Sequence, residues 1–352
     1  MPSHLRTSRS AFALAAALLL GAVGTGARAD DFSDRFTFQG YGYQHYLQST
    51  KNDYLGAGNQ GTWDENFLGL VLSATVTDKS KLWAQFQGSA ADGTRFTWFF
   101  LDYQLSDNLR AHLGRVKMPL GFYNEIIDVK SLQLSALEPT IYQGAADMVH
   151  DAYHGVGFDY EQDLAGGHVL WQAWGGNAYD VDPPDDSRDR RAFGLRATYR
   201  TPIDGLRLML SGYRTRVELL ADQSMSNEDR VLAGAEYVKG NWDLKAEYAK
   251  HKFMGVKSHG YYVQAGYTLA DKWMPYLRYD DYTSDTTQRS DPSYYQKTAV
   301  AGLGYKFDPN IGLRLEVHAN RGYALPVASG EVAAGAGANR WTMLVAGVNF
   351  SF

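Results

Sequence analysis

Apolar and polar residues alternate with a period of two along most of the chain. In residues 311–320, apolar side chains occupy the odd positions, and Arg, Glu, His and Asn follow at the even ones. The same alternation recurs at 99–105, 193–200, 242–248 and 344–352. Successive side chains of a strand face opposite sides of the sheet. The pattern therefore predicts strands with one apolar and one polar face, as a transmembrane β-barrel needs.

About sixteen segments carry this pattern, each close to the roughly 9–11 residues with which a tilted strand crosses a bilayer. An even number of strands places both ends of a bacterial barrel on the same side of the membrane. The fold predicted is all-β, a transmembrane antiparallel β-barrel. The predicted strands are 35–48, 66–77, 81–88, 97–105, 109–116, 154–162, 168–176, 191–200, 206–214, 230–239, 242–253, 260–269, 273–283, 296–307, 311–321 and 340–352.

The connections between these strands alternate between short and long. The short ones, such as Asp308-Pro309-Asn310, are rich in residues that close tight turns. Short periplasmic turns and longer extracellular loops are typical of outer-membrane barrels. The predicted long connections are 49–65, 89–96, 117–153, 177–190, 215–229, 284–295 and 322–339, with a shorter one at 254–259.

The N-terminus predicts export. Arg6 and Arg9 precede a short apolar run at 11–23, and Ala27-Arg28-Ala29 matches a signal-peptidase site. We therefore expect residues 1–29 to be a cleaved signal peptide and residues 30–352 to form one barrel domain in the cell outer membrane. The apolar run is shorter than the roughly 20 residues of a membrane-spanning helix.

Composition narrows the function classes. The 24 Tyr, 16 Phe and 8 Trp favour strands, and the absence of Cys excludes disulfides, thiolate metal ligands and Cys nucleophiles. The 34 basic and 39 acidic residues nearly balance, so nothing indicates a nucleic-acid partner. Aromatic residues gather near predicted strand ends, among them Tyr248, Tyr279, Tyr282 and Trp341 at the outer ends, where lipid meets water.

The longest connection, about 117–153, is the third long one and contains several acidic residues. Acidic groups on an inward loop that face basic groups on the wall filter ions by sign. The acidic candidates are Glu125, Asp128, Asp147 and Asp151. The basic candidates on polar strand faces are His112, Arg196, Lys245, Arg278 and Arg314. They are interleaved with Asp102, Glu236, Glu247, Asp280 and Glu316, so a simple structural role as paired or hydrated charges stays open for each.

The strand and loop pattern resembles the Gram-negative porins, and the terminal Phe352 resembles their C-terminal aromatic signature. The segment Gly114-Arg115-Val116-Lys117-Met118-Pro119-Leu120-Gly121 is similar to a motif of the phosphate-selective (O/P-like) porins. The resemblance implies a third extracellular loop folded into the lumen, a homotrimer, and insertion by the outer-membrane assembly machinery. It also implies passive diffusion of small hydrophilic solutes and ions, without a cofactor. The first four strands offer few or no inward basic residues, unlike general porins, so the choice between anions and cations stays open.

Three alternatives to a general pore remain. An anion- or phosphate-preferring channel needs Lys and Arg side chains that converge at the constriction. A barrel enzyme needs a nucleophile or activated water with a base; the nearest cluster is His150-Asp151 with His154, which is also readable as metal ligands. The chain contains no Gly-x-Ser-x-Gly, His-Glu-x-x-His or phosphate-loop motif, so we expect no enzyme and no metal site. A surface anchor or adhesin would have a lumen blocked by the third loop.

Overall fold

The computed structural model of the protein describes residues 35–89, 93–179 and 187–352. The chain divides into two units, Met1–Thr37 and Phe38–Phe352, and the second contains nearly all of the described residues. The signal peptide expected at 1–29 lies outside the described residues. Within the described part, no helix has the length and apolar character needed to cross a membrane.

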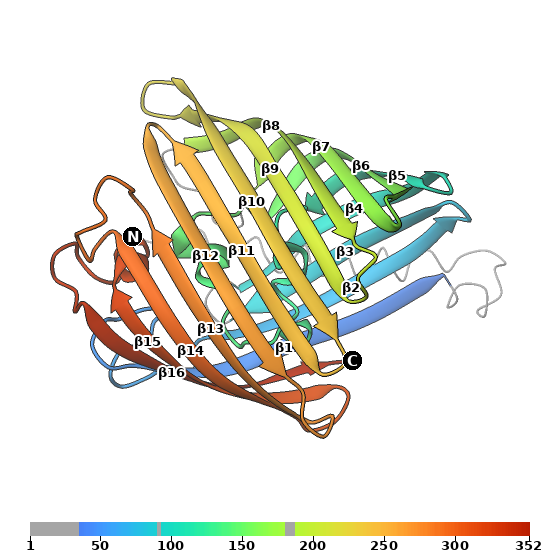
Figure 1. Cartoon of the computed structure of the whole chain (residues 1–352). Coiled ribbons are helices and arrows are strands. Elements are labelled where there is room, and N and C mark those ends of the chain that lie inside the picture. Colours follow the sequence, from blue (N-terminus) through green and yellow to red (C-terminus); the bar gives the residue numbers. More distant parts are fainter. Residues whose placement is uncertain (1–34, 90–92, 180–186) are drawn as a thin grey trace, which may run out of the picture. The chain divides into compact units, whose positions relative to one another are not determined.

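Sixteen antiparallel strands form a closed barrel, in which each strand pairs with its neighbours in the chain and β1 pairs with β16 (Figure 1). Closure leaves no unpaired sheet edge. The strands are β1 (Phe36–Ser49), β2 (Asn66–Thr77), β3 (Ser80–Ser89), β4 (Gly93–Ser106), β5 (Leu109–Lys117), β6 (Ala152–Leu164), β7 (Gly167–Tyr179), β8 (Ser187–Arg200), β9 (Leu206–Leu219), β10 (Met225–Lys239), β11 (Trp242–Phe253), β12 (Val256–Tyr267), β13 (Trp273–Thr283), β14 (Tyr295–Lys306), β15 (Ile311–Gly322) and β16 (Arg340–Ser351).

The two ends of the barrel sheet meet in register. Tyr41 lies opposite Ser351, and the pairing continues to Ser49 opposite Met343. Beyond the last paired strand residue, the backbone of Phe352 exchanges two hydrogen bonds of 2.8 Å with Gly40. The C-terminal residue is therefore part of the closure, with its ring largely exposed on the barrel.

The period-two pattern sorts side chains as predicted. On β15, Arg314, Glu316 and His318 are 6%, 0% and 2% exposed, whereas the intervening Leu315 and Val317 are 57% and 43% exposed. Most exposed large apolar side chains lie on the same outward parity of their strands. The barrel thus has an apolar exterior and a polar interior, because each strand directs its apolar face outward and its polar face into the barrel.

Several connections are shorter than the sequence pattern predicted. The predicted loop 215–229 is mostly strand, because β9 continues to Leu219 and β10 begins at Met225. The connection expected at 254–259 is a turn at Met254 and Gly255, both with positive φ. These strand extensions carry polar residues on both faces: Thr215 is buried, Arg216 is exposed, and Asp229 pairs outward with Arg214 at 2.6 Å. The apolar alternation stops there, although the backbone ladder continues.

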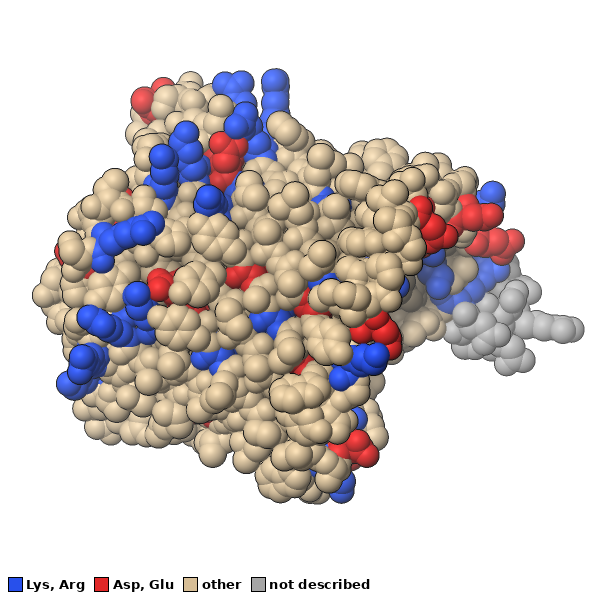
Figure 2. All heavy atoms as spheres, in the orientation of Figure 1, with Lys and Arg blue, Asp and Glu red and all other residues tan. Residues whose placement is uncertain are grey.

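On the outer surface of the barrel, basic residues lie between a zone of tyrosines and the ends of the strands that carry the longer loops. Outward-facing tyrosines Tyr248, Tyr261 and Tyr279 are followed along their strands or on neighbouring strands by cations. The cations are Lys250, Lys252, Lys257, Lys297 and Arg321. In Figure 2, many Lys and Arg side chains of the visible face gather toward the left and upper rim, where Figure 1 shows the longer loops. An aromatic zone with charges beyond it is typical of a membrane–water boundary.

Two aromatic residues expected in the outer lipid-facing ring point inward instead. Tyr282 and Trp341 are each 3% exposed and pack in the interior core. Tyr282 donates a hydrogen bond of 2.9 Å to the carbonyl of Ala146, and the Trp341 indole donates one of 2.9 Å to Gly322. The sequence correctly predicted that both residues lie near strand ends. The predicted lipid-facing orientation is wrong, because both side chains are on the inward face of their strands.

A charge on the outward face of β15 tests this assignment. We expect Leu315→Arg, at mid-strand, to lower the free energy of unfolding in a bilayer by roughly 2–4 kcal/mol, because lipid does not solvate a guanidinium. The control Ile311→Arg, at the strand end, should cost about 0–1 kcal/mol because its charge reaches the interface. Denaturant titration of protein folded in vesicles measures both. Equal costs at the two positions would contradict the assignment.

Candidate functional site: the loop inside the barrel

The segment between β5 and β6, residues 118–151, lies inside the barrel as a folded loop, hereafter the inner loop (Figure 1). It contains four short 3-10 turns, η1 (Asn124–Ile126), η2 (Lys130–Leu132), η3 (Thr140–Tyr142) and η4 (Gly144–Ala146). Met118, Tyr123 and Ile141 are almost fully buried in one core with the wall residues Leu232 and Tyr262. The loop predicted at 117–153 therefore has a small hydrophobic core of its own, which packs against the barrel wall.

The acidic residues of the inner loop each have a cationic partner. Glu125, 40% exposed, forms an ion pair with Arg196. Asp128 and Asp151 both pair with Lys117 at the end of β5, at 3.0 Å for Asp128.

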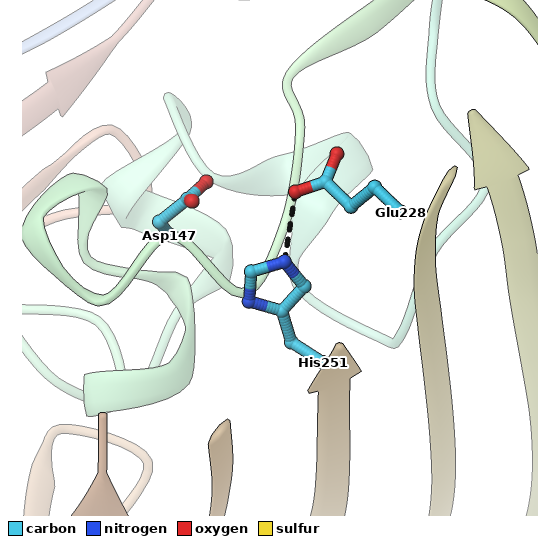
Figure 3. Close-up of side chains that lie close together, drawn as sticks. All are labelled: Asp147, Glu228 and His251. Carbon is cyan, nitrogen blue, oxygen red and sulfur yellow. Dashed lines mark hydrogen bonds and ion pairs between the residues drawn. The ribbon is translucent and has the colours of Figure 1, made fainter. Parts of the chain in front are cut away.

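Asp147, 62% exposed, pairs with the fully buried Arg230 at 2.6 Å. Its carboxylate also lies close to Glu228 and His251 of the wall (Figure 3). These ion pairs connect the inner loop to β5, β8 and β10.

Carboxylates of the wall accept hydrogen bonds from the backbone of the inner loop. Phe122 donates to Glu247 at 2.9 Å, Thr140 to Asp280 at 2.9 Å, and Ala136 to Glu316 at 2.5 Å. Buried backbone N–H groups need such partners. These three contacts come from β11, β13 and β15, so they attach the loop along one side of the barrel.

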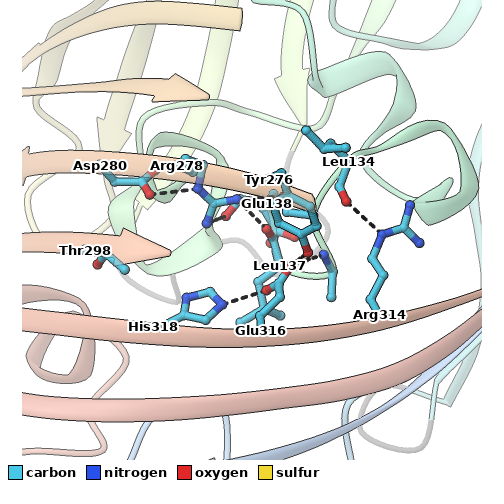
Figure 4. Close-up of polar contacts among 12 residues, drawn as sticks. Leu134, Leu137, Glu138, Tyr276, Arg278, Asp280, Thr298, Arg314, Glu316 and His318 are labelled. Atoms are coloured by element: carbon cyan, nitrogen blue, oxygen red, sulfur yellow. Dashed lines mark hydrogen bonds and ion pairs between the residues drawn. The ribbon is translucent and has the colours of Figure 1, made fainter. Parts of the chain in front are cut away.

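Arginines of the same wall donate to loop carbonyls. Arg278 donates to the carbonyl of Leu137 at 2.8 Å and to the Ser135 hydroxyl at 2.7 Å, and it pairs with Asp280 at 2.8 Å (Figure 4). Arg314 donates to the carbonyl of Leu134 at 2.9 Å. A guanidinium offers five N–H donors in a fixed geometry. One arginine can therefore hold several loop positions at once.

Tyr142 of η3 adds a further link between loop and wall. Its hydroxyl lies 2.9 Å from both carboxylate oxygens of Glu247. Burial, together with the neighbouring Glu247, raises the pKa of the Tyr142 phenol well above its ordinary value. The phenol therefore remains a protonated donor, which a carboxylate acceptor needs.

Three of the five basic wall candidates lie beneath the inner loop. Arg278 and Arg314 bind its backbone, and Lys245 pairs with Glu236 at 2.8 Å while its ammonium lies 4.6 Å from the centre of the Tyr123 ring. All three are less than a tenth exposed. Parity placed them inside correctly, but the loop covers them.

The other two basic candidates lie nearer the opposite wall. Arg196 of β8 donates to the carbonyl of Gly121 at 3.0 Å and to Gln172 at 2.6 Å. His112 of β5 lies 3.3 Å from Asp159 and 3.8 Å from Asp102. His112 is therefore placed among wall carboxylates, away from the arginines that hold the loop.

A pocket of about 150 Å³ opens beside the first turn of the inner loop. Three arginines from β8 and β9 contribute to it together with loop and wall carboxylates. Its lining residues are Gly121, Phe122, Glu125, Glu161, His168, Leu170, Arg196, Thr198, Arg200 and Arg207. Arg207 pairs with Glu236 and Arg196 with Glu125. Among the described residues, Arg200 has no carboxylate partner.

Sequence reasoning missed a buried polar cluster around Arg230, which we call the Arg230 cluster. Arg230 contacts Glu228 at 2.8 Å, Tyr213 at 2.7 Å and His150 at 2.9 Å. His150 also lies 3.3 Å from Asp189. The predicted loops 177–190 and 215–229 had placed Asp189 and Glu228 outside the wall, although Tyr213 and Arg230 lay within predicted strands. Continuing the strand parity of β10 backward from Leu232 would have placed Glu228 inside.

The enzyme reading of His150, Asp151 and His154 is not supported by their geometry. His150 belongs to the Arg230 cluster, and Asp151 pairs with Lys117. His154 accepts a hydrogen bond of 2.9 Å from Arg115, on the outward parity of β5 and β6. The three side chains have separate partners on different sides of the sheet, so they do not form one site.

Comparison with known proteins establishes the fold. No model of a known protein family matches the chain, and no curated protein matches its sequence. Similar solved structures include an anion-selective porin from Comamonas acidovorans, with TM-score 0.62, 16% identity, and coverage of 90% of this chain and 99% of that one. OmpF of Salmonella typhi gives 0.61, 15%, and coverage of 90% and 97%. The trimer form of OmpT of Vibrio cholerae gives 0.55, 14%, and coverage of 91% and 100%. The fold is that of the outer-membrane porins; the phosphate-selective group remains a prediction.

Removing one arginine anchor should loosen the inner loop without opening the barrel. We expect Arg278→Met to raise amide exchange in residues 134–140 by about a hundredfold, since losing one partner of a buried pair costs roughly 3 kcal/mol or more. Exchange in the strand ladder should be unchanged. The control Arg321→Met removes an outward-facing arginine. Unchanged protection of 134–140 in Arg278→Met would contradict the anchoring role.

Proposed function

We propose that the protein is an outer-membrane porin through which small hydrophilic solutes and ions diffuse passively. The observation that carries this proposal is a closed sixteen-stranded barrel with an apolar exterior and a polar, charged interior. Barrels of this size enclose an aqueous channel. Diffusion then requires only a hydrated path with a constriction. The inner loop would form this constriction.

The proposed cellular context follows from the same features. The apolar exterior fits outer-membrane lipid, and the predicted signal peptide would export the chain. The exposed C-terminal Phe352 would serve recognition by the outer-membrane assembly machinery. A homotrimer is proposed because one structure with this fold is described as a trimer form.

The proposed path runs between the inner loop and strands β4–β8. The loop's hydrogen bonds to β11, β13 and β15 hold part of it against that side of the barrel wall. On the β4–β8 side, the interior carries His112, Asp102 and Asp159, which interact with one another. The ion pair of Glu125 and Arg196 would border this path, so that a permeating ion meets charges of both signs there.

An anion preference is the second candidate. It is favoured by the pocket beside Gly121, where Arg196, Arg200 and Arg207 converge and Arg200 has no carboxylate partner among the described residues. A guanidinium binds phosphate or carboxylate groups through paired hydrogen bonds. The likeness to an anion-selective porin is compatible with this reading.

Single-channel recording in planar bilayers tests the pore. We expect the purified, folded protein to give stepwise, ohmic conductance, because ions move through a permanently hydrated lumen. A heat-modifiable barrel that inserts but conducts no ions would overturn the proposal. Such a result would favour the surface-anchor reading.

Charge substitutions in the pocket test the anion preference. Under a salt gradient, Arg200→Gln should move the reversal potential toward cation preference, because a cationic side chain without a counter-charge is removed. Glu161→Gln, in the same pocket, should move it the opposite way. The outward-facing Arg321→Gln serves as the control. Equal reversal potentials for Arg200→Gln and Glu161→Gln would place the selective charges elsewhere.

A further inference from the structure

Three side chains that can bind a metal ion meet where the inner loop reaches the wall (Figure 3). Asp147 follows η4 on the loop, Glu228 lies on β10 and His251 on β11. One potential ligand atom from each lies within 4.8 Å of the others. The two wall residues are diagonal neighbours across the strand pair, because Glu228 lies opposite Phe253 and His251 lies opposite Arg230.

The donor set selects a class of metal. One imidazole nitrogen and two carboxylates suit Zn²⁺ and neighbouring first-row divalent ions, whereas Mg²⁺ and Ca²⁺ take oxygen ligands. In a tetrahedral zinc site with bonds of about 2.0–2.2 Å, ligand atoms lie about 3.4 Å apart. Glu228 and His251 already lie 2.8 Å apart. On metal binding, Glu228 and His251 would separate by roughly 0.6 Å and Asp147, on the loop, would move toward them.

Each carboxylate keeps an oxygen that Arg230 does not use. Arg230 contacts Oδ1 of Asp147 at 2.6 Å and Oε2 of Glu228 at 2.8 Å. Oε1 of Glu228 instead accepts from Nε2 of His251. A metal at Nε2 requires the nitrogen's lone pair, so the proton of a neutral imidazole moves to Nδ1 and no net proton is lost.

The charges of the Arg230 cluster favour a cation. Asp147 and Glu228 both pair with the guanidinium of Arg230, and Asp189 lies 3.3 Å from His150. Two carboxylate ligands thus share one guanidinium, and charge in a partly buried site needs compensation. A divalent ion adds positive charge beside both carboxylates.

Solvent access is present on the loop side. The Asp147 side chain is 62% exposed, whereas Glu228 is 5% exposed. An ion can therefore enter along Asp147, and water can complete the coordination there. The neighbouring group of His150, Asp189 and Glu228 shares Glu228 and is more enclosed, so one ion per chain is expected.

We propose that Asp147, Glu228 and His251 bind one Zn²⁺ or similar first-row divalent ion per chain, joining the inner loop to β10 and β11. The ion adds a link beside the arginine anchors. It binds in the folded state only, because the ligands come from three separated segments, and binding therefore stabilises the loop in its packed position.

Calorimetric titration of ZnCl₂ into untagged, folded, chelator-treated protein in detergent tests the site. We expect about one Zn²⁺ per chain and at least about tenfold weaker binding for Asp147→Asn and for His251→Gln, since each loses a direct ligand. His259→Gln, an outward-facing histidine on β12, is the matched control and should bind within about twofold of the unmodified chain. Mg²⁺ in about hundredfold excess should not displace Zn²⁺.

Several results would contradict the metal site. Binding that is unchanged in both Asp147→Asn and His251→Gln would overturn the site, as would no binding by the unmodified chain beyond that of the double variant. Displacement by Mg²⁺ would show an oxygen-only site and would also contradict the proposal. If His251→Gln fails to fold, Asp147→Asn decides the matter, because Asp147 is an exposed loop residue. None of these results depends on whether the barrel conducts ions.

Discussion

Charge sorting across the sheet is the constraint on which the rest of the structure depends. A barrel that shows apolar side chains to its surroundings must turn its charged residues inward, and buried charges are stable only with partners. Here the interior charges come in opposite signs on neighbouring strands, as Glu236 of β10 and Lys245 of β11 show. These side chains pair with one another and also have donors and acceptors that bind the backbone of the inner loop.

The loop and the wall therefore stabilise each other. A 3-10 segment inside a barrel has backbone groups without intrasegment partners, and the wall carboxylates and guanidiniums meet them. Arg314, for example, would be a buried cation without the carbonyls of the loop, and the loop would have unsatisfied carbonyls without Arg314. This reciprocity explains why three basic residues expected to line water instead support protein. Arg200, an exposed residue of β8 in the pocket beside the first loop turn, remains available to a permeating ion.

Much of the fold was predictable because strand parity is a local property. The boundaries of 66–77, 242–253 and 273–283 agree with the observed strands, and the inward orientation of Arg314 follows from its neighbours in the chain. Contacts of the loop were not predictable, since they join residues far apart in sequence, such as Ala136 and Glu316. The Arg230 cluster was missed for a different reason: polar residues cover both faces of β9 and β10 there, so the alternation that marks a strand disappears.

We propose that the inner loop, held to the wall, sets the width of the path. The most direct test is liposome swelling with neutral sugars of increasing size, for the unmodified chain and for one whose residues 123–146 are replaced by a short Gly-Ser linker. Both should be shown folded by heat-modifiable electrophoresis. We expect the unmodified chain to admit only small sugars and the shortened chain to admit larger ones. The same size limit in both would contradict it.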